Sequence, residues 1–253
     1  MKAKNARLRT LKQRTMKWLG GSWNQERNGK IASTLSTLVL TMGLSGNVPA
    51  QGLVHAQGLK EFEIREASTG FPPATNLAAA LDALSSTPGV ISYTVPTINY
   101  KAGPSNRFLD DATFRSDPMD GFALEATGKI VVKGSNLTWT FGVGSDDGFL
   151  LEIEGGEFIA SDETVAVSAG SVTATDGNTL FYDGPRSPAE SYGVFRFDSP
   201  GVYKVRLIFF EVFGGESLEL FAAPGDQLLT LDTAPFELIN ADSKTAIQLV
   251  PDR

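Results

Sequence analysis

The chain has 253 residues, with 22 Lys+Arg against 29 Asp+Glu, no Cys and a single His. Nine of the basic residues and one acidic residue precede position 57, which leaves 13 basic and 28 acidic residues for the rest. Such an acidic body would repel nucleic-acid phosphates, so nucleic acid is not expected as a partner. Because the one His, His55, lies at the end of the basic leader, the body lacks thiolate and imidazole metal sites, disulfides and catalytic triads. Oxygen ligands and the hard cations that they bind remain.

Residues 1–56 have the layout of an export signal. A basic stretch, Met1–Lys30, precedes the more apolar Ile31–Gly46, and small-residue cleavage candidates follow at Val48–Ala50 and Val54–Ala56. A membrane anchor is the alternative, but Ile31–Gly46 is too short and too rich in Ser and Thr to span a bilayer comfortably. We therefore expect an exported protein, at the cell surface, in the periplasm or extracellular, with no stable transmembrane segment.

The pattern of the body predicts an all-β sandwich or barrel with one short early α-helix. In Asn76–Leu84, three leucines share one helical face. Short strands between turn signals are predicted at Phe62–Ile64, Val90–Tyr100, Gly121–Ala126, Lys129–Lys133, Leu137–Val143, Phe149–Glu154, Val194–Asp198, Val202–Glu211, Ser217–Ala222, Leu228–Leu231 and Phe236–Ile239. We expect one β domain over residues 57–225, followed by a C-terminal β extension or tail over residues 226–253.

Two adjacent acids, Asp146 and Asp147, lie between the predicted strands Leu137–Val143 and Phe149–Glu154. Asp147-Gly148 favours a tight hairpin turn because both residue types tolerate positive φ, and Asp146 is then an ordinary polar loop residue. That interpretation leaves the second acid unexplained, because neighbouring carboxylates repel one another unless they are separated, protonated or bridged by a cation. The pair is therefore a candidate cation site.

Two sequence blocks resemble the protective-antigen-type (PA-14) domain family. One is LTWTFGVGSDDGFLLEIEG at Leu137–Gly155, and the other is GVYKVRLIFFEVFGGESLEL at Gly201–Leu220. In the family, a strand followed by S-D-D-G and an apolar strand precedes a block with G-x-Y-x-aliphatic-R, an aromatic pair and a Gly-rich loop. The resemblance covers about residues 60–223. It implies a β-sandwich or barrel of the PA-14 type, which occurs in secreted adhesins, toxins, glycosidases and cell-surface proteins.

In the sugar-binding adhesin branch of that family, two adjacent Asp residues joined by a cis peptide hold one Ca²⁺ that also binds sugar hydroxyls. The resemblance implies this role for Asp146 and Asp147. Placing the branch's second loop on this chain without a gap puts Glu211 at the position of an Asn ligand, and Phe213 and Gly215 at two carbonyl ligands. Glu in place of Asn keeps an oxygen ligand and adds charge and length.

The loop Asp183–Glu190 and the residues that flank it include three further predicted ligand-binding residues. Tyr182 and Tyr192 flank this loop, and connecting loops carry binding residues more often than cores do. Tyr182, Asp183 and Tyr192 are therefore predicted to contact a sugar, with the two rings stacking on it. The alternative is that these residues only cover the end of the barrel.

These features together predict a secreted or cell-surface carbohydrate- or glycoconjugate-binding module that is assisted by Ca²⁺ and is not an enzyme. A structural or adhesion module without sugar binding is the first alternative, because one fold hosts unrelated functions. A glycosidase is the less favoured alternative. It needs two carboxylates roughly 5–9 Å apart, and nothing in the sequence pairs a general acid in an apolar setting with a nucleophile.

Overall fold

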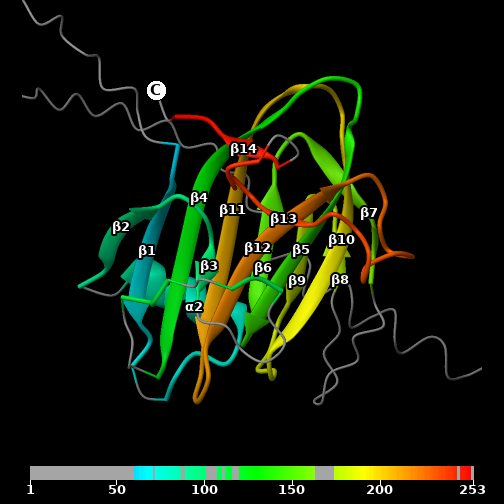
Figure 1. The fold of residues 1–253 in the computed structure, drawn as a ribbon. Coiled ribbons are helices and arrows are strands. Elements are labelled where there is room, and N and C mark those ends of the chain that lie inside the picture. Colours follow the sequence, from blue (N-terminus) through cyan, green and yellow to red (C-terminus); the bar gives the residue numbers. More distant parts are fainter. Residues whose placement is uncertain are drawn as a thin grey trace, which may run out of the picture. The chain divides into compact units, whose positions relative to one another are not determined.

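The described part of the chain folds into two antiparallel β-sheets and one helix (Figure 1). This computed structural model describes residues 60–251, except residues 71, 87–88, 101–106, 110–111, 116–119, 163–173 and 244–245. The predicted export leader, residues 1–56, lies outside the described residues. Within the described ranges, no helix combines the length and the hydropathy needed to cross a membrane.

Within the described residues, the first sheet has eight strands in the order β2-β1-β4-β11-β6-β9-β8, with β14 also paired to β4. Their bounds are β1 Phe62–Ser68, β2 Ile91–Val95, β4 Phe122–Val132, β6 Phe149–Ile153, β8 Ala174–Asp176, β9 Thr179–Tyr182, β11 Gly201–Glu211 and β14 Gln248–Leu249. The second sheet has six described strands in the order β13-β12-β5-β10-β7, with β3 also paired to β12. Their bounds are β3 Asn99–Tyr100, β5 Thr138–Asp146, β7 Gly156–Ser161, β10 Ala189–Phe197, β12 Ser217–Pro224 and β13 Glu237–Leu238.

The predicted fold class, an all-β sandwich with one short early helix, is confirmed. Several predicted strands are wrong in detail. The predicted strand Val90–Tyr100 is divided into β2 and β3, which belong to different sheets. Gly121–Ala126 and Lys129–Lys133 are parts of one continuous strand, β4, and Leu228–Leu231 lies in turns.

The main core fills the space between the two sheets. In β6, for example, Phe149, Leu151 and Ile153 are fully buried while the residues between them are half-buried, which is the period of two expected for a strand with one face on the core. Opposing side chains from the second sheet, such as Phe141 and Val143, complete this core. Burial of each such side chain contributes about 1.5–3 kcal/mol, so this interface dominates the stability of the sandwich.

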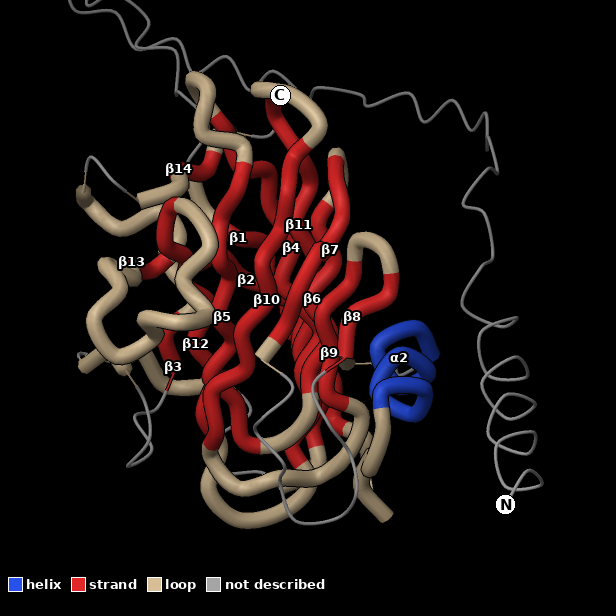
Figure 2. Tube along the Cα trace, turned by 90° about the vertical axis from the view of Figure 1, so that its right-hand side faces the viewer, coloured by secondary structure: helices blue, strands red, loops and turns tan. Residues whose placement is uncertain are grey.

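The helix α2 (Leu77–Ser86), the blue helix in Figure 2, covers the outer face of the first sheet and contacts β1, β4 and β11. Its buried side chains Ala80 and Leu84 belong to one cluster with Ile208 and Phe210 of β11. Asn76 caps the helix, because its Oδ1 accepts a hydrogen bond from the Ala79 N–H at 2.9 Å. The helix therefore forms a second, smaller apolar cluster with the outer face of the first sheet.

C-terminal residues cover the outer face of the second sheet. Phe236 is buried against Tyr192 and Phe221, with Leu228 and Leu231 packed beside them. The same C-terminal segment adds β13 to the edge of the second sheet and pairs β14 with β4 of the first. The residues after position 225 therefore contact both sheets and contribute buried apolar surface to the described domain.

Candidate metal centre

Two connections that cross from one sheet to the other lie side by side. The first runs from β5 to β6 through Asp147 and Gly148, and the second runs from β11 to β12 through residues 212–216. Because β11 pairs with β6 and β12 pairs with β5, the two connections meet at the same end of the sandwich. A hydrogen bond of 2.9 Å from the Val212 N–H to Asp147 Oδ2 joins them, and the Phe210 N–H near the end of β11 donates to the Gly148 carbonyl at 3.1 Å. Residues that are distant in sequence are thereby brought together.

The predicted Asp-Gly hairpin is wrong. β5 and β6 belong to different sheets, and the φ angle of Gly148 is not positive. Glycine is needed here for space instead, since a Cβ would lie 2.5 Å from the Phe210 ring and 2.8 Å from the Gly184 carbonyl oxygen. The alternating hydrophobic pattern predicted both strands, but a pattern along one strand does not identify the strand with which it pairs.

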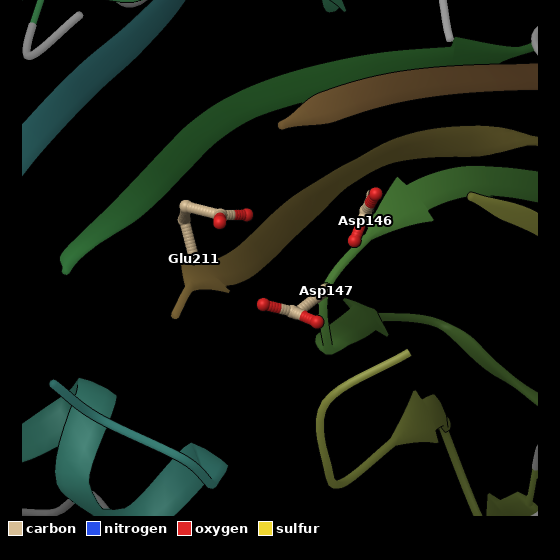
Figure 3. A group of neighbouring side chains, drawn as sticks. All are labelled: Asp146, Asp147 and Glu211. Carbon is tan, nitrogen blue, oxygen red and sulfur yellow. The ribbon is translucent and has the colours of Figure 1, made fainter. Parts of the chain in front are cut away.

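Asp146, Asp147 and Glu211 form a cluster that we call the acidic cup. Each offers a carboxylate oxygen, and these oxygens all lie within 4.8 Å of one another. Figure 3 shows the three side chains converging, with Asp146 at the end of β5, Asp147 directly after it and Glu211 at the end of β11. The exposed fractions are 8% for Asp146, 5% for Asp147 and 1% for Glu211, and the peptide bond between the two aspartates is cis. The acids singled out from the sequence are thus neighbours in space.

Asp147 is fixed in place by backbone donors from two other segments. Its Oδ1 accepts a hydrogen bond from the Arg186 N–H at 2.8 Å, and its Oδ2 accepts one from the Val212 N–H at 2.9 Å. Burial raises the pKa of Asp147, while these two N–H groups and the Arg186 charge oppose the increase. Because an ionised carboxylate has about four acceptor positions, both oxygens retain the capacity to bind a cation.

Glu211 has no such donors. Among the described residues, neither its Oε1 nor its Oε2 has a hydrogen-bond partner, although both atoms are buried. Burial, followed by the charges of Asp147 and Asp146, raises the pKa of Glu211 to about 9. A buried polar group without partners is costly, and buried carboxylates usually pair or coordinate a metal. Glu211 is therefore the feature of the cup that the rest of the described protein does not satisfy.

Asp146, the third acid of the acidic cup, also favours a bound cation. Burial, followed by the charge of Asp147, raises the pKa of Asp146 to about 7, and the Arg186 charge opposes this shift. The three pKa values are thus all above the ordinary range, with burial as the largest cause of each. A bound cation would stabilise all three charged forms, because an opposite charge within a few ångströms favours ionisation.

Arg186 is a central residue that the sequence did not reveal. It is 4% exposed, and its guanidinium carbon lies 4.8 Å from the centre of the Tyr182 ring. Its guanidinium donates hydrogen bonds to Ser145 Oγ (2.6 Å), Ser191 Oγ (2.7 Å), the Ala189 carbonyl (2.9 Å) and the Ser145 carbonyl (3.2 Å). Burial lowers its pKa to about 10. Arg186 therefore organises the loop that holds Asp147, and no feature of the short Pro-Arg-Ser-Pro segment signals that this arginine is buried.

The predicted sugar-stacking role of Tyr182 and Tyr192 is wrong. Tyr182 is fully buried under Arg186. Tyr192 is 4% exposed, packs against Phe221 and Phe236, and donates a hydrogen bond from its hydroxyl to Glu190. Neither ring has a free face because the strands that carry them direct both side chains into apolar clusters.

Asp183 is placed at the helix and not in the cup. Its Oδ1 accepts a hydrogen bond of 2.7 Å from the Leu77 N–H in the first turn of α2, a favourable position for a negative charge. The loop Asp183–Glu190 therefore contributes helix capping through Asp183 and support for Asp147 through Arg186. The ligand-binding role of Asp183 stays a prediction.

Phe213 and Gly215 lie in the connection that borders the acidic cup. The Gly214 N–H donates a hydrogen bond of 3.2 Å to Asp120 Oδ1, and a Cβ placed on Gly215 would lie 3.9 Å from Asp146 Oδ2. The Phe213 side chain is 58% exposed. The role of the two carbonyl oxygens as metal ligands stays a prediction.

The donor chemistry of the acidic cup suits Ca²⁺. This ion takes six to eight oxygen ligands from carboxylates, carbonyls and water in flexible geometry. The cup offers three carboxylates and neither nitrogen nor sulfur ligands, and Glu211 supplies two buried oxygens without partners among the described residues. These residues therefore fit the ion that the sequence resemblance implies.

No family model matches the chain, and neither does any curated protein. Among solved structures, the PA14 sugar-binding domain from an RTX adhesin is similar at 16% identity and a TM-score of 0.47, over 72% of this chain and 94% of that chain. The PA14 domain of the MpAFP antifreeze protein is similar at 16% identity and a TM-score of 0.48, over 75% and 89% of the two chains. The A domain of Epithelial Adhesin 6 from Candida glabrata, in complex with Galβ1-3GlcNAc, is similar at 15% identity and a TM-score of 0.38, over 78% and 93%. All three scores are below 0.5, so the function of this chain rests on its own residues.

Proposed function

We propose that this chain is an exported, non-catalytic glycan- or glycoconjugate-binding module whose acidic cup holds Ca²⁺. The observation that carries the proposal is Glu211, which is buried, faces Asp146 and Asp147, and has no hydrogen-bond partner for either carboxylate oxygen among the described residues. A cation at this position would compensate a charge that the protein leaves unpaired.

The residues of the cup have two roles in the proposal. Asp147 is held by two backbone N–H groups, so it presents its carboxylate in a fixed orientation. Glu211 and Asp146 supply the remaining negative charge. When bound, Ca²⁺ offers coordination positions that two neighbouring sugar hydroxyls can fill in place of water. Phe213, on the border of the cup, offers an exposed ring against which the apolar face of a sugar can pack.

The glycan part of the proposal is supported by the sequence. Both blocks of the PA-14 resemblance are present in order, and the residues of the acidic cup lie in those two blocks. Export is supported by the basic and then apolar leader.

A structural module is the second candidate. It is favoured by Asp147, which links the β5–β6 connection to both the Arg186 loop and the Val212 segment and would do so without any sugar. In that case Ca²⁺ would only strengthen the end of the sandwich. A glycan array with Ca²⁺ or with a chelator separates the two candidates, because calcium-dependent binding favours the glycan module and a blank array favours the structural one.

Calorimetry of the full chain with Ca²⁺ tests the metal site. We expect Glu211→Gln to lower the affinity on the order of 100-fold, because affinity for Ca²⁺ depends steeply on the number of charged ligands. The matched control is Glu157→Gln, which removes an equally negative side chain from an exposed ion pair with Arg196 on β10. No binding at millimolar Ca²⁺, or equal affinities for both variants, would contradict the site.

A further inference from the structure

We infer that Ser217 is a further residue of the calcium site, and that its hydroxyl holds the oxygen atom, of water or of a sugar, that is bound to the ion beside Asp146. This inference rests on the proposed function and names the group that positions the occupant of the cup. It follows from the place of Ser217 in the second sheet and from the unused hydrogen-bonding capacity of its side chain.

The first step is the place of Ser217 in the fold. Ser217 is the first residue of β12 and directly follows the connection of residues 212–216. In the ladder between β5 and β12 it lies opposite Asp146. Side chains that are directly opposite one another in an antiparallel pair share one face of the sheet, with Cβ atoms about 4.5–5.5 Å apart. The Ser217 side chain therefore starts beside that of Asp146, at the border of the acidic cup.

The second step is the state of the Ser217 hydroxyl. Ser217 is 1% exposed, and its Oγ has no hydrogen-bond partner among the described residues. A serine hydroxyl can donate one hydrogen bond and accept two, and its burial without any partner costs free energy. A polar group that enters the cup from outside the chain would remove this cost.

Other buried hydroxyls of the second sheet are satisfied by the protein itself. Thr140, in β5, is fully buried, and its Oγ1 donates to the Gly225 carbonyl at 2.8 Å and accepts from the Gln227 N–H at 2.9 Å. The Ser145 hydroxyl, also in β5, donates to the Asp147 carbonyl at 2.7 Å. Ser217 differs from both because the described residues supply no partner for it.

Two unsatisfied side chains lie at the two ends of the same connection. Glu211 ends β11 in the first sheet, and Ser217 begins β12 in the second. Among the described residues, buried side-chain polar atoms without partners occur in Asn99, Arg107, Trp139, Tyr182, Glu211 and Ser217. An acidic cluster alone would not identify a ligand site. A buried carboxylate and a buried hydroxyl that both lack partners beside the two aspartates indicate that a polar ligand belongs there.

A neutral hydroxyl complements the three carboxylates of the acidic cup. An oxygen atom of water or of a sugar hydroxyl that binds Ca²⁺ still carries a proton, and the charge of the ion makes this proton a stronger donor. Ser217 can accept a hydrogen bond from that proton and donate its own proton to Asp146. Partners of this kind orient the groups around a metal and change its affinity. Ser217 is therefore a positioning residue that adds no charge to the cup.

Calorimetry of the full chain with Ca²⁺ as the only ligand tests this role. We expect Ser217→Ala to lower the calcium affinity about 3- to 10-fold, the effect of one lost hydrogen bond. The matched control is Thr140→Val, which removes a buried hydroxyl that has partners within the protein. Its calcium affinity should stay within about twofold of that of the wild type. Ser217→Thr keeps the hydroxyl and should retain more calcium affinity than Ser217→Ala.

Stability without calcium separates the positioning role from a merely structural one. In urea with a chelator, Thr140→Val should unfold at a lower concentration than the wild type, because the Gly225 carbonyl and the Gln227 N–H lose their partner. Ser217→Ala should unfold at the same or a higher concentration, because it removes a buried hydroxyl that lacks partners among the described residues. Equal calcium affinities of the wild type and Ser217→Ala, or a loss of stability in Ser217→Ala as large as that in Thr140→Val, would overturn the inference and leave the calcium site in place. Absence of calcium binding by the wild type would overturn the proposed metal site, and this inference with it.

Discussion

Glu211 and Glu219 are two buried glutamates with opposite surroundings. Glu219, in β12, is fully buried, and its Oε2 and Oε1 accept hydrogen bonds from the backbone N–H groups of Arg107 (3.0 Å) and Phe108 (2.9 Å). Glu211, at the end of β11, is equally buried and has no donor among the described residues. Both glutamates are therefore buried, but Glu219 accepts hydrogen bonds from the backbone and Glu211 faces other carboxylates. The difference lies in which groups satisfy the oxygens.

The largest expected effect is on stability, at Glu219. Glu219→Gln replaces one acceptor oxygen by an N–H donor and places it against the Arg107 or Phe108 N–H. We expect a loss of about 3 kcal/mol in the free energy of unfolding, measured by urea denaturation with a chelator present. Calcium affinity should change less than about threefold in the same variant, because Glu219 is not part of the acidic cup. A loss below about 1 kcal/mol would show that these two hydrogen bonds do not distinguish Glu219 from Glu211.

Asp147 combines both kinds of surroundings, so its substitution should affect stability and calcium binding together. Asn at position 147 can keep one of the two backbone hydrogen bonds from Arg186 and Val212 and must lose the other. We expect Asp147→Asn to lower the free energy of unfolding by about 2 kcal/mol with a chelator present, and to weaken calcium binding. If calcium binding fell with unchanged stability, Asp147 would be a ligand without the structural role assigned to it.

The family resemblance predicted the acidic cup, whereas its surroundings were not predicted. The resemblance grouped Glu211 with Asp146 and Asp147 because the two sequence blocks occur in order, and the absence of Cys and of His from the body left oxygen ligands for a cation. Their proximity depends on two crossing connections that meet at one end of the sandwich. That crossing was not predictable from the alternation of residues, which fits a hairpin as well as a change of sheet.

The aromatic side chains show the same limit of sequence analysis. Tyr182 and Tyr192 flank a loop, which favours a binding role, but both lie at buried positions of β9 and β10. Phe213 follows a buried strand in an apolar run, and its side chain is exposed. Whether such a residue faces the core or solvent near a strand end depends on where the chain leaves the sheet, and this position is set by tertiary packing.

The pH dependence of stability should reflect the raised pKa values of Asp146 and Glu211. The pKa values of Asp146 and Glu211 are raised in the folded state, to about 7 and about 9, so the folded protein binds more protons than the unfolded chain at neutral pH. The stability of the calcium-free protein should therefore be highest at acidic pH and fall as the pH rises through about 7 and then about 9. One proton taken up on folding corresponds to a slope of at most about 1.4 kcal/mol per pH unit.

Urea denaturation of the wild type and Glu211→Gln between about pH 5.5 and 8.5, with a chelator, isolates the contribution of Glu211. We expect the wild type to lose about 1 kcal/mol per pH unit relative to the variant, and saturating Ca²⁺ to remove this difference in slope. Parallel pH profiles for the two calcium-free proteins would mean that Glu211 has a partner that compensates its charge. The contrast with Glu219 would then disappear.

The substitution of Phe213 has the smallest expected effect, and it distinguishes calcium binding from glycan binding. Phe213→Ala removes the exposed ring and keeps the backbone carbonyl that the family resemblance assigns to calcium. We expect glycan affinity to fall about 3- to 10-fold, since aromatic contacts contribute roughly 0.5–1.5 kcal/mol beyond buried area, while calcium affinity is retained. Leu229→Ala is the matched control, because Leu229 is 99% exposed and lies in the turn after β12. Equal glycan affinities for both variants would exclude the ring as a contact and leave the calcium-bound hydroxyls as the basis of recognition.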